Sequence, residues 1–386
     1  GAVALPSEGA GPSRAPAAEP RAKRPKVEHE EASWGGLPPP PAAGIIPQPL
    51  LPIVHVAGQS GAAGFADGPC SSALFNGPTG LGIAADGSLL VSDSDNRRLR
   101  KVSVMYVKPE AVPAEGASWA SFVSYGAVST IVGNGDPGIR EGRGNISALV
   151  DPQGIVSTKE GVTFITDSGS HTVRRVAPNG EITLLAGNGN PGFQDGTGLQ
   201  AAFDHPYGLT IGSDGTLYVA DSGNHRIRTV SQQGDVKTLA GTGAPGHKDG
   251  SGGAAQFFYP VGIAMDSEGC LYVTDRANHR IRKVTTKGTV STLAGSGRNA
   301  VIDGKGQAAA FSFPNAIALD RAAIYVSDTF TFRIRRILKD GQTRTLAIGF
   351  PPPAAPVGAA PAASAAPPTT KPAPAAPKSA PKSEAP

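Results

Sequence analysis

One pattern recurs through most of this chain, and a repeat of this length restricts the possible folds more than any other feature. In each copy an aspartate closes an apolar, strand-like run. The spacings are 74, 54, 54 and 53 residues between Asp93, Asp167, Asp221, Asp275 and Asp328. The chain therefore contains five copies of one unit, and an insertion at 105–126 lengthens the first spacing.

Each unit alternates short β-type runs with turn residues. In the third unit the runs cover 208–211, 217–220, 226–230 and 236–240. The turn Ser213-Asp214-Gly215 between the first two runs is typical of a β-hairpin. No window has a sustained helical period. The pattern predicts an all-β fold, a β-propeller of four-stranded blades, with five or six blades because a sixth run of the outermost type lies at 53–57.

The strand end and the turn that follows it resemble the NHL repeat. The third unit reads Tyr218-Val-Ala-Asp221 and then Asn224-His225-Arg226-Ile227-Arg228. The fourth reads Tyr272-Val-Thr-Asp275 and then Asn278-His279-Arg280-Ile281-Arg282. The resemblance covers about 53–349 and implies a β-propeller. It leaves the function open, because related propellers serve as protein scaffolds, RNA binders and a few enzymes.

Composition separates both ends of the chain from the repeats. Of the 36 prolines, one third falls in 1–52 and another third in 351–386. Segments rich in Pro and Ala bury too little apolar surface to fold. We therefore expect two disordered tails around one NHL-type propeller domain at 53–350, the second tail serving as a linker. The first residue is Gly1, which predicts a processed or shortened product.

Several features bear on location. No stretch approaches the roughly 18 consecutive apolar residues of a membrane span, so we expect a soluble protein with no membrane partner. Cys70 and Cys270 cannot form a disulfide framework, which favours an intracellular, reducing compartment. The basic cluster at 21–26, with Arg21, Lys23 and Lys26, resembles a nuclear import signal. These features predict a cytoplasmic or nuclear protein.

The predicted topology brings the Gly-rich connectors and the turns between second and third strands to one face, here called the connector face. We expect a protein partner to bind there. The candidate contact residues are Arg97, His171, His225, Lys248, His279, Phe330 and Phe332.

Three of these candidates, His171, His225 and His279, occupy equivalent positions in successive units. Zinc needs its ligand nitrogens about 2.0–2.1 Å from the ion, whereas turns of neighbouring blades diverge. We therefore expect packing roles, and neither a metal nor another cofactor. No small-molecule substrate is evident in the sequence.

Arginines follow the turn at Arg98, Arg226, Arg280 and Arg333, and a second set lies two residues further on, at Arg100, Arg174, Arg228, Arg282 and Arg335. Blade faces are covered by neighbours, so these side chains need partners, and the repeated aspartates are the natural ones. A phosphate- or acid-binding patch is the alternative. Aromatic residues before the first strand are expected to pack between blades, at Phe75, Phe203, Phe257 and Phe311.

Charge and motifs rank the possible functions. The propeller domain has 27 basic and 25 acidic side chains, so its net charge of +2 creates no strong field. No Gly-x-Ser-x-Gly, phosphate-binding loop or paired His-Glu motif occurs. A non-catalytic protein-binding scaffold is the leading hypothesis. RNA binding through a basic surface patch is the first alternative, and a channel-sited lyase or lactonase is the second.

Overall fold

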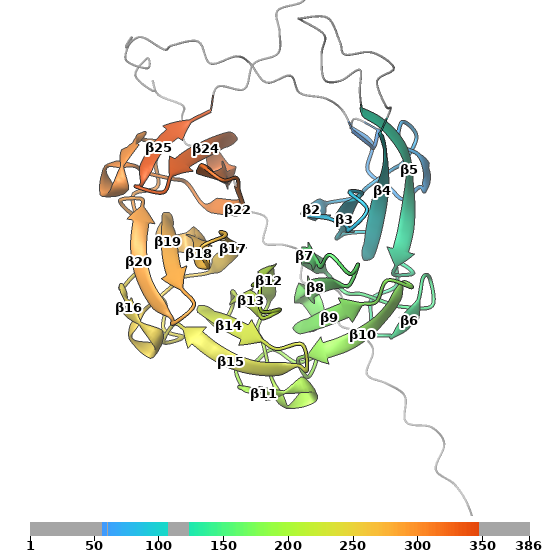
Figure 1. Ribbon diagram of the computed structural model, residues 1–386, viewed down its shortest axis with the longest axis horizontal. Coiled ribbons are helices and arrows are strands. Elements are labelled where there is room, and N and C mark those ends of the chain that lie inside the picture. Colours follow the sequence, from blue (N-terminus) through green and yellow to red (C-terminus); the bar gives the residue numbers. More distant parts are fainter. Residues whose placement is uncertain (1–55, 60, 107–122, 347–386) are drawn as a thin grey trace, which may run out of the picture. The chain divides into compact units, whose positions relative to one another are not determined.

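The computed structural model describes residues 56–59, 61–106 and 123–346. Five antiparallel sheets stand around one axis as the blades of a β-propeller (Figure 1). The predicted all-β propeller is thus confirmed, with five described blades. The predicted tails at 1–52 and 351–386 lie outside the described residues, and so do the basic cluster at 21–26 and most of the run at 53–57.

The blades follow one another along the chain. Blade 1 contains β1 (Gly68–Pro69), β2 (Pro78–Ile83), β3 (Leu89–Asp93), β4 (Arg98–Tyr106) and β5 (Val123–Val132). Blade 2 contains β6 (Gly142–Arg143), β7 (Pro152–Ser157), β8 (Thr163–Asp167), β9 (Thr172–Val176) and β10 (Glu181–Ala186). Blade 3 contains β11 (Gly196–Thr197), β12 (Pro206–Ile211), β13 (Leu217–Asp221), β14 (Arg226–Val230) and β15 (Asp235–Ala240).

Blade 4 contains β16 (Gly250–Ser251), β17 (Pro260–Met265), β18 (Cys270–Asp275), β19 (Arg280–Thr285) and β20 (Thr289–Ala294). Blade 5 contains β21 (Gly304–Lys305), β22 (Pro314–Leu319), β23 (Ala323–Asp328), β24 (Arg333–Leu338) and β25 (Gln342–Thr345). Single-turn 3-10 helices occur at η2 (Ser168–Ser170), η3 (Gly198–Gln200), η4 (Gly252–Ala254), η5 (Arg276–Asn278), η6 (Gly306–Ala308) and η7 (Thr329–Thr331). None of the described helices has the length and apolar character needed to cross a membrane.

Each sheet has five strands where the repeat pattern predicts four. The extra strand comes from the Gly-rich connector, as in blade 3, where Gly196 pairs with Val236 and Thr197 pairs with Asp235. The connector thereby supplies hydrogen-bonding partners to the outermost strand, whose edge would otherwise be open. The sequence pattern does not reveal this strand, because a pairing of only two residues is too short to show the period of a β-strand.

The core lies between blades. The middle strands are buried on both faces because a blade packs on each side, and all five residues of β13 are buried. Phe203, Phe257 and Phe311 are fully buried in three of these interfaces, as predicted, and Leu149 takes the same place in blade 2. Phe75 of blade 1 is only half-buried.

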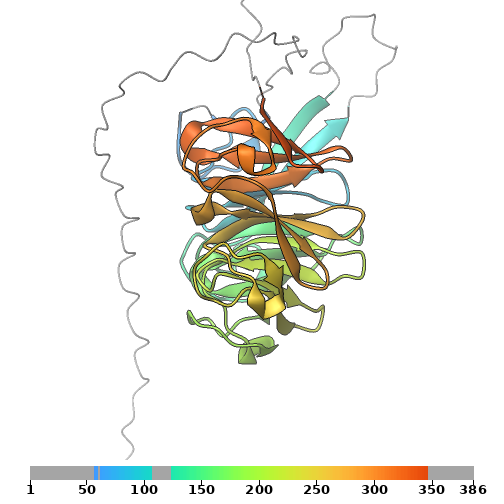
Figure 2. The same cartoon turned by 90° about the vertical axis from the view of Figure 1, so that its left-hand side faces the viewer.

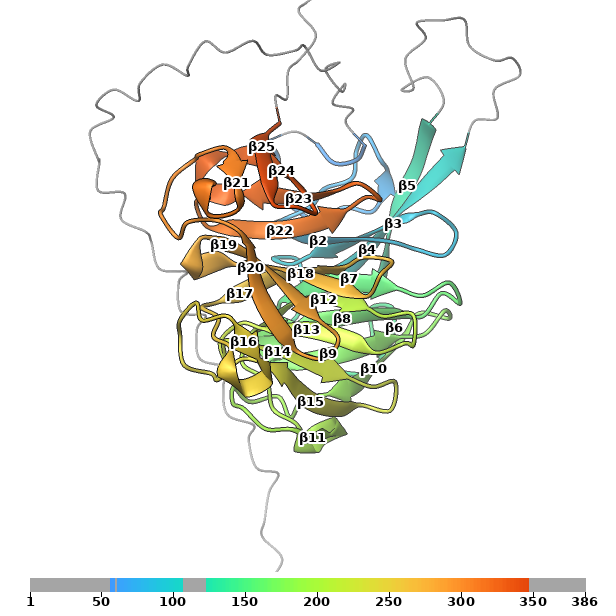
Figure 3. The same ribbon diagram turned by 60° about the vertical axis from the view of Figure 1, so that its left-hand side comes forward.

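In its described parts, the insertion at 105–126 lengthens the hairpin of β4 and β5 and forms no separate element. Its ends continue β4 and β5, with Val104 opposite Tyr125 and Tyr106 opposite Val123. Figures 2 and 3 show this hairpin projecting beyond the other blades. Residues 107–122 lie outside the described chain.

Candidate functional site

The turn between the second and third strands has the same backbone shape in every blade. One non-glycine residue in each turn adopts the left-handed conformation, with φ of 53° to 55° at Arg97, His171, His225, His279 and Phe332. Such residues are uncommon outside tight turns. Five different candidate side chains therefore project from the same position of the turn.

The turns and the connectors meet, as the predicted topology requires. In blade 3, Asn224 Nδ2 donates to the carbonyl of Gly192 in the preceding connector at 2.8 Å. Arg226 Nη2 donates to the carbonyl of Thr242 in the following connector at 2.6 Å. The equivalent Asn and Arg side chains make the same two bonds in blades 1 and 4, so three of the five turns are tied to the connectors on both sides.

The three candidate histidines form contacts between blades. Each Nδ1 accepts the backbone N–H of a residue in the next blade, from His205 to His171 at 3.1 Å, from Tyr259 to His225 at 3.2 Å and from Phe313 to His279 at 3.1 Å. Burial lowers the pKa of all three imidazoles. A neutral ring is what this contact needs, because a protonated Nδ1 has no lone pair to accept a hydrogen bond.

The cationic candidates have different surroundings. Arg97 Nη1 donates to the carbonyl of Gly135 at 2.8 Å, so part of its donor capacity is used within the protein. Lys248 is exposed on the connector before blade 4, and its backbone carbonyl accepts from Arg282 Nη2 at 3.1 Å. Lys248 therefore presents its side chain to solvent from a fixed backbone.

Blade 5 places aromatic side chains at the edge of this face. Phe332 is 92% exposed and Phe330 is 48% exposed. The Phe330 ring lies 4.7 Å from the Phe313 ring, which in turn contacts His279 of blade 4. Exposed aromatic groups on a rigid support are typical of protein-binding surfaces.

The repeated Asp and Arg side chains pair inside the blades, as the sequence predicts. Arg228 is fully buried and donates to Asp221 at 2.7 Å and to Asp195 at 2.6 Å. Asp221 also accepts from Asn224 Nδ2 and from the backbone N–H of Asp204, each at 2.8 Å. Burial raises the pKa of Asp221 to about 6, against the opposing effect of Arg228. These buried charges stabilise the turn and are not available to bind a ligand.

Blade 2 departs from this scheme. Glu141 stands where blade 3 has Asp195, and its Oε1 accepts the backbone N–H of Leu184 at 2.7 Å. Arg174 is fully buried, yet its Nε and Nη1 have no hydrogen-bond partner. Asp167 instead accepts from Ser170 at 2.7 Å, because serine stands where the turns of blades 1, 3 and 4 have asparagine.

A second departure gathers His171, Asp204 and His205 at the junction of blades 2 and 3. One ligand atom from each lies within 4.8 Å of the others. Asp204 and His205 do not belong to the repeated histidine position and were not predicted from the sequence. Their signal was a polar pair before Pro206, where blades 4 and 5 carry an aromatic residue directly before the proline. His205 Nδ1 pairs with Asp204 Oδ1 within blade 3 at 2.7 Å, and the His205 N–H bond to His171 joins this pair to blade 2.

The strands nearest the axis bear on the enzyme hypothesis (Figure 1). These strands, β2, β7, β12, β17 and β22, are all described, and none contains Asp, Glu, His, Lys, Arg or Cys. A general acid or base needs a titratable side chain within reach of substrate. The described inner strands supply no group of these types.

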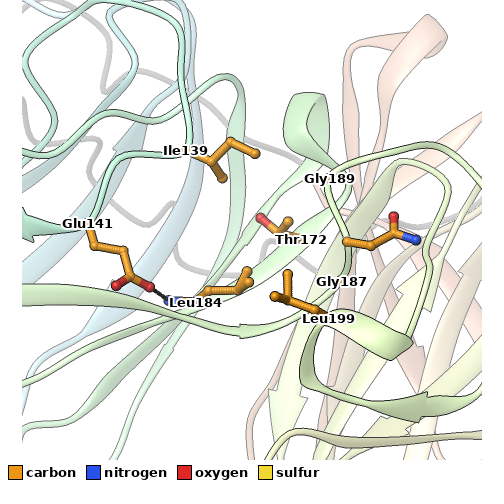
Figure 4. A pocket seen from close by; sticks show the side chains of 8 residues that line it. Ile139, Glu141, Thr172, Leu184, Gly187, Gly189 and Leu199 are labelled. Carbon is orange, nitrogen blue, oxygen red and sulfur yellow. Dashed lines mark hydrogen bonds between the residues drawn. The ribbon is translucent and has the colours of Figure 1, made fainter. Parts of the chain in front are cut away.

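A shallow hollow of about 230 Å³ lies instead near the outer strand of blade 2 (Figure 4). It is bordered by Ile139, Leu184 and Leu199 together with glycine backbone. Glu141 is the only titratable side chain in its lining, and that carboxylate is held by Leu184 N–H. The hollow therefore lacks an acid–base pair.

The repeated blades and turns define a repeat-built β-propeller. Comparisons with known proteins identify similar chains. Residues 141–231 match the family described as the teneurin NHL domain, and residues 257–284 match the NHL repeat. The chain is 31% identical over 306 residues to Protein SUPPRESSOR OF QUENCHING 1, chloroplastic, of Arabidopsis thaliana, covering 74% of this chain and 27% of that protein. It is 28% identical over 307 residues to NHL repeat-containing protein 2 of Homo sapiens, covering 73% and 41%.

Among solved structures, an auxiliary nutrient binding protein from Bacteroides thetaiotaomicron aligns with a TM-score of 0.49 and 18% identity, covering 69% of this chain and 60% of that one. This chain belongs to the NHL-repeat family. It spans less than half the length of the two curated relatives named above.

Proposed function

We propose that this propeller is a non-catalytic scaffold that binds a protein partner through its connector face. The observation that carries the proposal is the exposure of Phe332 and Phe330 at 92% and 48%, on a face whose turns are hydrogen-bonded to the connectors in blades 1, 3 and 4. Aromatic anchors on a rigid support lose little conformational entropy on binding.

The described inner strands carry no Asp, Glu, His, Lys, Arg or Cys, and Tyr207 is their one titratable side chain, which supports a non-catalytic role over a channel-sited lyase or lactonase. The burial of the repeated arginines supports protein over RNA, because Arg100, Arg228 and Arg282 expose no side-chain area to phosphate. The connector face also carries exposed Lys248 and half-buried Arg97 as polar groups. A polar rim around an apolar centre is the usual anatomy of such an interface.

The test is affinity capture from the source cells with the full chain as bait. The double variant Phe330→Ala with Lys248→Ala removes one anchor and one rim charge, and we expect it to lose the specifically retained proteins. Leu199→Ala removes an equally apolar side chain, 67% exposed in η3, and serves as the matched control. Retention of the same proteins by the double variant contradicts the proposal.

A further inference from the structure

The arginine that directly follows the turn occupies the same site in blades 1, 3 and 4. Its guanidinium group donates to a carbonyl of its own turn and to a carbonyl of the following connector. It also lies against a connector glycine, because a Cβ added at Gly135, Gly243 or Gly297 would be 2.2 to 2.7 Å from the nearest guanidinium nitrogen. These two carbonyls and this glycine are here called the arginine site, and its occupants are Arg98, Arg226 and Arg280.

Blade 2 has this site but no arginine to occupy it. Thr172 stands at the arginine position, and its Oγ1 is hydrogen-bonded to Ser170 Oγ at 2.8 Å. The two carbonyls of the site belong to Ser170 and Asn188, and among the described residues no side chain donates to either of them. Thr172, Asn188 and Gly189 line the hollow near the outer strand of blade 2 (Figure 4). That hollow is therefore an arginine site that the chain leaves open.

The backbone of the site is the same with and without the arginine. The connector glycines of blade 2 have φ of 103° at Gly187 and 86° at Gly189, against 111° at Gly241 and 89° at Gly243 in blade 3. A Cβ added at Gly187 would lie 2.5 Å from the carbonyl oxygen of the left-handed turn residue, and the equivalent distance at Gly241 is 2.6 Å. The Asn188 carbonyl lies between the two glycines, so it is held as its counterparts are in the occupied sites.

The charge around the site favours a cation. Blade 3 has two carboxylates and two guanidinium groups here, at Asp195, Asp221, Arg226 and Arg228. The equivalent residues of blade 2 are Glu141, Asp167, Thr172 and Arg174. Arg174 is fully buried and does not line the hollow, whereas Glu141 does. The lining thus contains one carboxylate and no basic side chain, which favours a positively charged group.

We propose that this hollow binds the guanidinium group of an arginine side chain supplied by a protein partner. A guanidinium group suits the site better than the ammonium group of lysine, because two separate carbonyls are offered to a planar group with several donors. The walls at Ile139 and Leu184 are apolar, which suits a weakly hydrated cation. The inference deepens the proposed protein-binding function and rests on it only for the source of the arginine.

Ile139 makes this site weaker than its counterpart in blade 3. There the guanidinium carbon of Arg226 lies 3.7 Å from the ring centroid of Phe193, which occupies the position of Ile139. In blade 2, Ile139 Cδ1 is 3.1 Å from the position of a Cβ added at Gly189, so its side chain covers part of the site. Ile139 is 48% exposed and has room to rotate toward solvent. The arginine therefore binds without a cation–π contact and is readily released.

The test measures binding of N-acetyl-arginine methylamide to the full chain through the NMR shifts of its backbone amides. We expect one site, with the largest shifts at 187–189. N-acetyl-citrulline methylamide has the same shape and no charge, and it should bind at least about tenfold more weakly because the charge-assisted hydrogen bonds are lost. Ile139→Phe should tighten binding of the arginine probe, because it supplies the ring that blade 3 has at this position.

Two variants fill or open the site. Thr172→Arg places an arginine of the chain in the hollow and should weaken binding of the probe at least about tenfold. Its thermal stability should be kept, because blades 1, 3 and 4 hold an arginine at this position. Arg226→Thr should create a second site in blade 3, where Phe193 remains. Thr286→Arg adds an arginine at an exposed turn of blade 4 and should leave binding unchanged. Leu199 lines the hollow outside the arginine site, so Leu199→Ala should also bind the probe normally.

The source of the arginine is tested by affinity capture with the full chain as bait. Thr172→Arg should lose proteins that the natural chain and Thr286→Arg both retain. Retention of the same proteins by Thr172→Arg would overturn the assignment to a protein partner. The Phe330→Ala with Lys248→Ala variant should bind the arginine probe normally, so failure of the connector face and failure of the hollow are distinguishable.

Three results overturn the assignment to a guanidinium group. The first is no shift at 187–189 with the arginine probe, or an equal loss of binding with Thr172→Arg and Thr286→Arg. The second is equal binding of the citrulline probe. The third is binding of acetate in the hollow in place of the arginine probe, which would mean that Arg174 reaches an anion there.

Discussion

At the residue scale, buried ion pairs support the turns of this propeller. Arg228 reaches Asp221 and Asp195 with its two terminal nitrogens, and equivalent side chains repeat the arrangement in blades 1, 4 and 5. Removing one partner from such a pair leaves an uncompensated buried charge. The shape of the turn therefore depends on buried charges that a ligand cannot reach.

Asp221→Ala should lower the free energy of unfolding by about 3 kcal/mol, because Arg228 remains buried without its partner. Urea unfolding monitored by circular dichroism measures the change. The control Asp235→Ala removes an exposed carboxylate of the same blade and should have a much smaller effect. An unchanged melting temperature for Asp221→Ala, together with lost partner binding, would contradict the structural role.

At the element scale, neighbouring blades are joined through small residues and histidines. Gly80, Gly154, Gly208 and Gly262 each face a backbone carbonyl of the next blade. The turn histidines of blades 2, 3 and 4 accept a backbone N–H from the following blade. Both contacts require close approach of whole strands, so their loss affects a junction and not only one side chain.

Gly208→Ala should destabilise the junction of blades 3 and 4 by roughly 1–3 kcal/mol, because the added Cβ overpacks it. The new atom would lie 2.4 Å from the carbonyl of Val261. Gly253→Ala is the matched control, since nothing lies within 4 Å of its Cβ position. Equal thermal stability of the two variants would show that the blades separate easily.

The three turn histidines should contribute less stability as the pH drops below about 6.5, the ordinary histidine pKa. Burial lowers the pKa of His171, His225 and His279, so the unfolded chain binds protons that the folded chain excludes. The folded state is fully favoured above the unfolded pKa and loses this contribution as the pH falls through the folded pKa. Urea titrations at several pH values measure it.

The triple variant His171→Gln, His225→Gln and His279→Gln keeps an acceptor oxygen at each junction and removes the titration. Its stability should depend less on pH over this range than that of the natural chain. Identical pH profiles for the two proteins would show that these imidazoles titrate freely in the folded state.

At the scale of the whole molecule, the propeller has little net positive charge. Its sequence carries a net charge of only +2 at 53–350, and its repeated inner arginines are buried and, apart from Arg174, ion-paired. Electrostatic steering of a polyanion needs a continuous basic path. The described surface instead offers aromatic groups at blade 5 and apolar groups at blade 1.

Single-stranded RNA should therefore bind the full chain weakly, with a shallow salt dependence. Each phosphate contact would steepen the slope by about 0.7 log unit per log unit of salt. Titration at two salt concentrations measures both quantities. Submicromolar affinity with a steep slope, reduced by Arg97→Glu or Lys248→Glu, would make RNA the leading partner.

The sequence alone determined the repeated unit, its strands and its turns. These features are local, because each unit carries its own alternation, its turn residues and its Asp and Arg within about one repeat length. The predicted runs in the third unit lie inside β12–β15, and the buried Asp221–Arg228 pair follows from the same spacing. The strands and turns of each unit can therefore be predicted from that unit's own residues, without reference to the other units.

Only the tertiary structure decided what happens between units. His171 meets Asp204 and His205 because two blades pack side by side, and the polar pair before Pro206 does not by itself say which residue of the neighbouring blade it meets. The connector adds a fifth strand through a two-residue pairing that is too short to show a period. Leu81 looks like Leu209 in sequence, yet one is 73% exposed and the other 6% exposed. Burial depends on which blade stands alongside, and a repeated sequence describes each blade but not its neighbour.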